Sequence, residues 1–168
     1  AMLTHGNVVS NILASVPVLD IRLGDRSLSF LPLSHIFERM AGHYALLYAG
    51  ASIYYAESIA TVVADLQLVR PTILVAVPRI YEKIYATVRD NVAGSSIVKR
   101  FIFHWAMLAG RLALPFIYEN RPAPLWIRFQ LWWSRHLVFN KILARTGGNL
   151  RFGVSGGAPL AGMLLEFF

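Results

Sequence analysis

The sequence contains no cysteine among its 168 residues. A disulfide framework and a thiolate metal site are therefore excluded, and nothing in the composition requires an oxidising compartment. Residues 1–6 also lack the basic start and the apolar run of a signal peptide, so the sequence does not predict export. Together these absences favour a cytoplasmic location.

Several common catalytic motifs are missing as well. The chain has no G-x-x-x-x-G-K-[ST], no G-x-G-x-x-G after a strand, no H-E-x-x-H and no G-x-S-x-G elbow. The sequence therefore gives no support to a simple hydrolase or to a dinucleotide-binding enzyme.

Acidic residues are scarce in the second half of the chain. Residues 1–94 hold seven basic and seven acidic residues, whereas residues 95–168 hold nine basic residues and two acidic ones. The formal net charge of +7 therefore comes from the second half alone. A basic surface can meet nucleic acid, anionic lipid or an acidic substrate, and the sign of the charge does not choose among them.

Short strand-like runs alternate with longer periodic stretches, which is typical of βα units. We expect strands over 27–32, 52–55, 73–77 and 151–155, and helices over 7–16, 36–48, 59–69 and 79–91. The run 73–77 has no polar alternation, as expected for a central strand of a parallel sheet with helices on both faces. The predicted fold class is α/β, with a Rossmann-like three-layer parallel sheet, and residues 1–168 are expected to form a single subdomain.

Residues 96–146 depart from this alternation and predict a helical-hairpin insertion, with helices over 97–116 and 125–144. Arg111 interrupts the first helix, and Arg128 and Arg135 interrupt the second, so neither is expected to span a membrane. Tryptophans beside basic residues suit a headgroup boundary, which makes contact of helices 97–144 with an anionic membrane surface one interpretation. Packing against the sheet or against other protein is the alternative. The aromatic residues lie among Leu, Ile and Val, so nucleic-acid binding is not expected.

Three predicted strands end in polar or glycine-rich segments, and parallel strands bring such ends to one sheet edge. In the first segment Ser34 is expected to cap the following helix, with His35 in its first turn. The second segment delivers Pro78, Arg79 and Tyr81 to that edge. An isolated histidine has a structural role more often than a chemical one, and this alternative stays open.

The third segment is a glycine-rich turn after the strand 151–155. Its glycines permit a ligand to approach the backbone closely, and Pro159 is expected in the first turn of the next helix. The same turn can serve as a plain tight connection. Its residues are Ser155, Gly156, Gly157, Ala158 and Pro159.

Taken together, four segments resemble the adenylate-forming, AMP-binding superfamily, and within it the long-chain acyl-CoA synthetases. The sequence AMLTHGN at 1–7 resembles the stretch after the family's phosphate-binding loop, and LPLSHIFER at 31–39 resembles its acyl-site motif. VPRIYEK at 77–83 resembles the following strand–helix motif, and VSGGAPL at 154–160 resembles the turn against adenine. The four occur in the family's order and cover nearly the whole chain.

The resemblance implies a ligase of fatty acid metabolism that uses ATP, Mg²⁺ and CoA. Acyl-AMP forms from ATP and a long-chain fatty acid, and CoA then displaces AMP. By resemblance, His35 lies beside the acyl carboxylate and the adenylate, and the turn at 155–159 lines the adenine side. Phe37 and Met40 are expected along the acyl tunnel, together with the helix that carries Pro78, Arg79 and Tyr81.

The same resemblance implies that important parts lie outside this segment. The phosphate loop is expected before Ala1, and the motif with the magnesium contacts, together with the C-terminal catalytic domain, after Phe168. Residues 1–168 are therefore expected to be an internal part of the enzyme's N-terminal domain and to be inactive alone, with no metal ligands. A ligase that hands acyl-AMP to a carrier protein stays open, as does a non-catalytic membrane-surface or lipid-binding module.

Overall fold

The computed structural model describes residues 2–168, so Ala1 of the segment 1–7 lies outside the described residues. The chain divides into two compact units. The first comprises the residues up to Val77 together with Arg145–Pro159, and the second comprises Pro78–Ala144 together with Leu160–Phe168. The expectation of a single subdomain over 1–168 stays a prediction.

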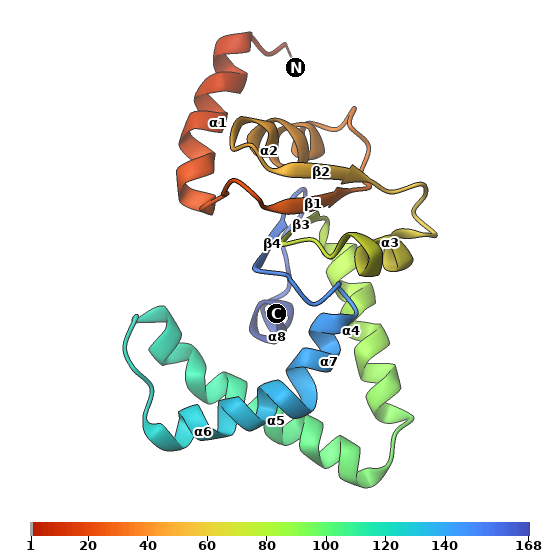
Figure 1. The fold of residues 1–168 in the computed structure, drawn as a ribbon, viewed down its shortest axis with the longest axis vertical. Helices are drawn as coiled ribbons and strands as arrows, with labels where there is room; N and C mark the ends of the chain where they lie inside the picture. Colours follow the sequence, from red (N-terminus) through yellow and green to blue (C-terminus); the bar gives the residue numbers. More distant parts are fainter. Residues whose placement is uncertain (1) are drawn as a thin grey trace. The chain divides into compact units, whose positions relative to one another are not determined.

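A parallel sheet forms the centre of the first unit (Figure 1). Within the described residues it has four strands in the order β2-β1-β3-β4. Their bounds are Arg26–Ser29 for β1, Ser52–Tyr55 for β2, Ile73–Ala76 for β3 and Phe152–Ser155 for β4. All of β3 is buried and it lies between β1 and β4, as its unbroken apolar run predicts.

Helices surround this sheet, which confirms the predicted α/β class. Helix α1 (His5–Leu19) lies beside α2 (Ala45–Tyr48), and α3 (Val62–Val69) packs against β1 (Figure 1). Leu46 of α2 packs with Ile73 and Val75, which alternation along β3 places on one face of the sheet. A hydrophobic core of the unit therefore lies between β3 and α2, and Phe37 and Ala41 of the segment before α2 pack against it.

That segment is a π-helix, η1 (Glu38–Tyr44), which continues directly into α2. The sequence predicts one ordinary helix over 36–48, and the wider π turn is not evident from its periodicity. The glycine at position 42 makes room for the side chain of Glu38, because a Cβ atom added there would lie 2.5 Å from Cδ of Glu38. The absent side chain leaves that space to the Glu38 carboxyl group.

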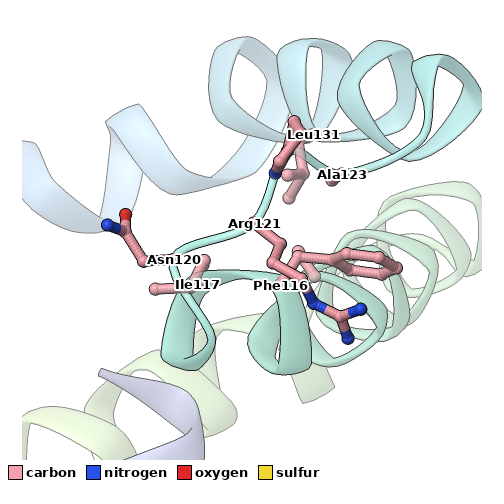
Figure 2. Close-up of a pocket in the computed structure, with 8 residues that line it drawn as sticks. Phe116, Ile117, Asn120, Arg121, Ala123 and Leu131 are labelled. Carbon is pink, nitrogen blue, oxygen red and sulfur yellow. The ribbon is translucent and has the colours of Figure 1, made fainter.

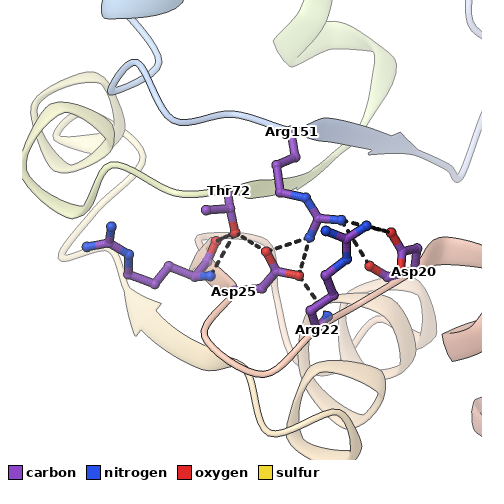
Figure 3. A network of polar contacts seen from close by, with 6 residues as sticks. Asp20, Arg22, Asp25, Thr72 and Arg151 are labelled. Carbon is purple, nitrogen blue, oxygen red and sulfur yellow. Dashed lines mark hydrogen bonds and ion pairs between the residues drawn. The ribbon is translucent and has the colours of Figure 1, made fainter.

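A polar network joins the amino ends of three strands, at the edge opposite the predicted site (Figure 3). Asp25 accepts hydrogen bonds from Nη1 of Arg151, at 2.7 and 2.6 Å, and from Oγ1 of Thr72 at 2.7 Å. Burial alone would raise the pKa of Asp25, but the hydrogen bonds from Arg151, Thr72 and the backbone N–H of Arg22, together with the charge of Arg151, outweigh burial, and the pKa is lowered. The network therefore fixes where β1, β3 and β4 begin.

The second unit is helical. Helix α5 (Ile97–Tyr118) packs along α6 (Leu125–Ser134), which confirms the predicted hairpin, and α5 buries the small residues Ala106, Ala109 and Ala113. The second arm continues through the π-helix η2 (Arg135–Phe139) into α7 (Asn140–Ala144). The remaining elements of the unit are α4 (Pro78–Ala93) and α8 (Gly162–Phe167).

One expectation about these helices is wrong. Pro159 does not lie in the first turn of the next helix, because α8 begins at Gly162. By length and composition alone α5 could cross a membrane, and the expectation that it does not span one stays a prediction. A single helix of this kind is weak evidence for a membrane span.

Candidate functional site

The carboxyl ends of β1, β3 and β4 lie along one edge of the sheet, because these strands are parallel neighbours. Phe30 leads out of β1, Val77 out of β3 and Gly156 out of β4. In an open α/β sheet, ligands bind beyond this kind of edge. The first unit therefore places two of the three predicted segments, 30–39 and 155–159, at a single edge.

The turn after β4 needs its two glycines for different reasons. Gly157 has a φ of +82°, a backbone conformation that side chains with a Cβ rarely adopt. Gly156 has no room for a side chain, since an added Cβ would lie 2.3 Å from Cε2 of Phe37. The ring of Phe37 therefore lies directly on the backbone of Gly156 and joins the segment 31–39 to the turn.

Ser155 has a buried hydroxyl group at the start of this turn. Its Oγ atom has no hydrogen-bond partner within the described part of the chain. Buried polar atoms normally have a partner, so this oxygen has unused capacity to donate or accept. Ala158 and Pro159, by contrast, are exposed.

His35 lies in the bend before η1, not in the first turn of a helix. Its Nδ1 atom accepts a hydrogen bond from the backbone N–H of Phe37 at 3.2 Å. The expected cap, Ser34, makes no such bond to the helix, because His35 supplies the acceptor in its place. An accepting Nδ1 leaves the proton of the neutral ring on Nε2, and the exposed side chain can present that N–H to a ligand.

The other predicted acyl-site residues have distinct surroundings. Met40 is half-buried within η1. Pro78, Arg79 and Tyr81 belong to the second unit, in the first turn of α4. Tyr81 is buried, its ring packs edge-on against Phe168 with centroids 5.3 Å apart, and burial raises the pKa of its hydroxyl group. This environment is that of a core residue of the second unit.

The sequence gives no role to Glu38, yet the structure buries it beside the site. Its Oε1 atom lies 2.6 Å from Oγ of Ser29, the last residue of β1. Burial raises the pKa of Glu38, and the hydrogen bond from Ser29 opposes that effect only in part. The sequence feature that could have drawn attention to Glu38 is its position as a lone acidic residue between Phe37 and the apolar residues of the following helix.

Two cavities lie in the second unit, and neither contains a predicted site residue. The larger, of about 460 Å³, lies at the turn between α5 and α6 and is lined by Phe116, Asn120, Arg121 and Leu131 among others (Figure 2). The other, of about 310 Å³, is lined mainly by apolar residues of α5, α7 and α8. Within residues 2–168 no group of three or more His, Cys, Asp or Glu side chains could hold a metal ion.

The chain is similar to known proteins over nearly its whole length. A protein-family model described as "AMP-binding enzyme" matches residues 1–168. The chain is 34% identical over 167 residues to the peroxisomal long chain acyl-CoA synthetase 7 of Arabidopsis thaliana, covering 99% of this chain and 22% of the relative. It is 33% identical over 168 residues to fatty acyl-CoA synthetase A of Dictyostelium discoideum, covering 99% and 23%.

A solved structure with a similar fold is the adenylation domain of a carboxylate reductase from Mycobacterium chelonae. The TM-score is 0.52 at 20% sequence identity, and the match covers 95% of this chain and 21% of that one. This likeness concerns the fold. The chain spans less than a quarter of the length of the two synthetases compared above.

Proposed function

Because the chain belongs to the AMP-binding enzyme family, we propose that it is part of an ATP-dependent enzyme that activates long-chain fatty acids. The observation that carries the proposal is the packing of Phe37 on Gly156, which joins an acyl-site motif to a glycine turn at one sheet edge. The names of the relatives, acyl-CoA synthetases, support the substrate class.

The proposed reaction has two steps. A carboxylate oxygen of the fatty acid attacks the α-phosphorus of ATP, the bond to the β-phosphate breaks, and acyl-AMP and pyrophosphate form. The thiol of CoA then attacks the acyl carbon, and AMP leaves as the thioester forms. ATP, CoA and Mg²⁺ are thus the proposed cosubstrates and cofactor of the parent enzyme, and the ligands of the metal would come from other parts of it.

The turn at 155–159 would provide the adenine side of the pocket. The exposed Gly157 presents backbone without a side chain, and the unpaired Oγ of Ser155 offers one more hydrogen-bonding group. Ala158 and Pro159 would complete this wall. Such a wall binds a planar base without needing a charged side chain.

His35 would act on the other side of the reacting atoms. With Nδ1 engaged by the backbone of Phe37, its Nε2–H can donate to the carboxylate of the fatty acid or to the adenylate. Phe37 and Met40 are proposed to line the acyl tunnel.

Substitution of His35 in the complete enzyme that carries this segment tests the proposal. We expect His35→Ala to lower fatty-acid-dependent pyrophosphate exchange by on the order of 10²-fold, the usual scale for loss of one positioned donor. His104→Ala, at an exposed histidine of α5, is the matched control and should leave the rate unchanged. An unchanged rate in His35→Ala would remove this histidine from the mechanism.

A second candidate function is contact with an anionic membrane surface, consistent with a cytoplasmic protein that is peripheral at a membrane. It is favoured by a specific observation: α6 exposes Trp126, Phe129 and Trp132 beside the exposed Arg128. Indole rings and arginines suit the boundary between headgroups and acyl chains.

Sedimentation with vesicles tests this second function. The chain should bind vesicles that contain phosphatidylserine and bind neutral phosphatidylcholine vesicles much less. The double substitution Trp126→Ala and Trp132→Ala should weaken binding, whereas Tyr54→Ala, at an exposed aromatic residue of β2, should not. Absence of binding to the anionic vesicles would eliminate the membrane function and leave the enzymatic proposal intact.

A further inference from the structure

The buried carboxyl group of Glu38 has no role in the reaction proposed above. The residue is only 1% exposed. Its Oε1 atom meets Oγ of Ser29 at 2.6 Å, while Oε2 is buried without a hydrogen-bond partner in the described part of the chain. Within residues 2–168 no ion pair to this carboxyl group is formed, although an unpaired buried charge is strongly unfavourable.

The neighbouring ionisable groups do not neutralise Glu38. On its own helix, Nε of Arg39 donates to the carbonyl oxygen of Leu33 at 2.8 Å, and Nδ1 of His43 meets the Tyr55 hydroxyl at 3.1 Å. β3, which also packs against η1, carries no ionisable side chain. The other ionisable residues on elements packed against η1, or within it, are His5 of α1, Arg26 of β1, Tyr44 of η1 and Tyr48 of α2.

The carboxyl group of Glu38 also fills a space that is left open by the glycine at position 42. A Cβ atom added to Gly42 would lie 2.5 Å from Oε1 and 2.6 Å from Oε2 of Glu38, so both oxygens occupy the space over this glycine. The group therefore bridges three points: the first residue of the π-helix, the bare backbone at Gly42 one turn later, and the end of β1 at Ser29. Phe37, the residue before Glu38, rests on Gly156.

We infer that Glu38 is a positioning residue, held as a neutral carboxylic acid, that fixes η1 to the end of β1 and thereby keeps Phe37 on the backbone of Gly156. The raised pKa agrees with the neutral form, because burial stabilises the protonated state. In this role Glu38 acts through Phe37 and takes no part in the proposed reaction itself. Its importance for catalysis rests on the proposed function, but its effect on Phe37 and Gly156 does not.

The test measures that effect directly in the 168-residue chain. A ring stacked on Gly156 should displace the NMR resonances of its Hα protons, and Phe37→Leu defines the spectrum without the ring. Glu38→Gln keeps the shape and the hydrogen bond of a neutral acid, so the displaced resonances should persist. Glu38→Asp shortens the side chain by one methylene group and should lose the displacement, as should Glu38→Ala.

Infrared spectroscopy reports the protonation state. The difference spectrum between the wild type and Glu38→Gln should contain the C=O stretch of a protonated carboxylic acid, which the control Glu57→Gln, at an exposed residue, should lack. Loss of the displaced resonances in Glu38→Gln, their persistence in Glu38→Asp, or absence of the acid band would each overturn the inference. If Glu38→Ala does not fold, the comparison of Gln with Asp still decides. Absence of fatty-acid-dependent pyrophosphate exchange in the complete enzyme that carries this segment would contradict the proposed function and leave these spectra unaffected.

Discussion

At the scale of single residues, the two glycines of the turn exclude a larger side chain for different reasons. Gly157 is restricted by its own backbone conformation, with φ at +82°, whereas Gly156 is restricted by the Phe37 ring above it. The size of the side chain at position 37 therefore affects substitutions at Gly156 and not those at Gly157. This difference separates strain within the chain from a contact across the site.

Replacement of Gly156 by alanine should force Phe37 out of place. We expect Gly156→Ala to lower the free energy of unfolding by about 1–3 kcal/mol, the usual range for overpacking. The double variant Gly156→Ala with Phe37→Ala should recover part of that loss, because the clashing ring is gone. Urea unfolding measures both, and Gly162→Ala, which meets no atom within 4 Å, is the control. Strictly additive effects of the two changes would show that the ring and the turn are not in contact.

Asp25 gives the chain a predictable response to acid. Its folded-state pKa is lowered, so the folded state binds a proton less readily than the unfolded state does. The resulting stabilisation is present above the unfolded-state pKa and is lost as the pH falls through the folded-state pKa. Asp25→Asn should lower the free energy of unfolding by about 1.5–3 kcal/mol at neutral pH, through the lost bonds to Arg151 and Thr72.

Urea unfolding as a function of pH measures this effect. The difference between the wild type and Asp25→Asn should shrink in acid, as Asp25 itself becomes neutral. The exposed Asp90 provides the matched control, Asp90→Asn. A difference that stays constant from neutral pH into strong acid would mean that the network does not depend on the charge of Asp25.

At the scale of elements, the apolar pattern predicts the sheet well. The apolar run at 73–77 predicts a strand, and the structure forms it as β3. The strand ends one residue earlier than expected, at Ala76. The end of β1 is less well predicted, because the chain already bends toward the turn at Pro32, where the N–H of His35 meets the Pro32 carbonyl oxygen. Periodicity records which side chains are apolar, and it does not record where the backbone changes its hydrogen-bonding partners.

The candidate site shows the same division. The sequence predicts that the segments with His35 and with Ser155 reach one sheet edge, since strand direction and order decide this. It does not predict the contact of Phe37 with Gly156 or the burial of Glu38, because both follow from the π turn of η1. A single glycine at position 42 distinguishes that turn, and many ordinary helices also contain a glycine.

Helix α5 of the hairpin buries several small residues. Ala109 is 1% exposed, so Ala109→Leu should overpack its surroundings and lower the free energy of unfolding by about 1–3 kcal/mol. The same change at the exposed Ala93, the last residue of α4, should have an effect within about 0.5 kcal/mol. Thermal or urea unfolding of both variants tests the packing, and equal effects would contradict it.

At the scale of the whole molecule, we predict that the 168-residue chain does not catalyse adenylation by itself. The chain spans less than a quarter of the length of the compared synthetases. A fatty-acid-dependent pyrophosphate exchange assay on the isolated chain should therefore give no signal above background. Robust exchange would refute the prediction.

The sheet also influences how the isolated chain behaves in solution. Within the described residues β2 and β4 are its two outer strands, and each has one side without a neighbouring strand. Such edge strands can pair with a second copy of the chain and nucleate aggregates. The net charge of +7 opposes this association through mutual repulsion, which salt screens. Self-association of the isolated chain should therefore increase with ionic strength.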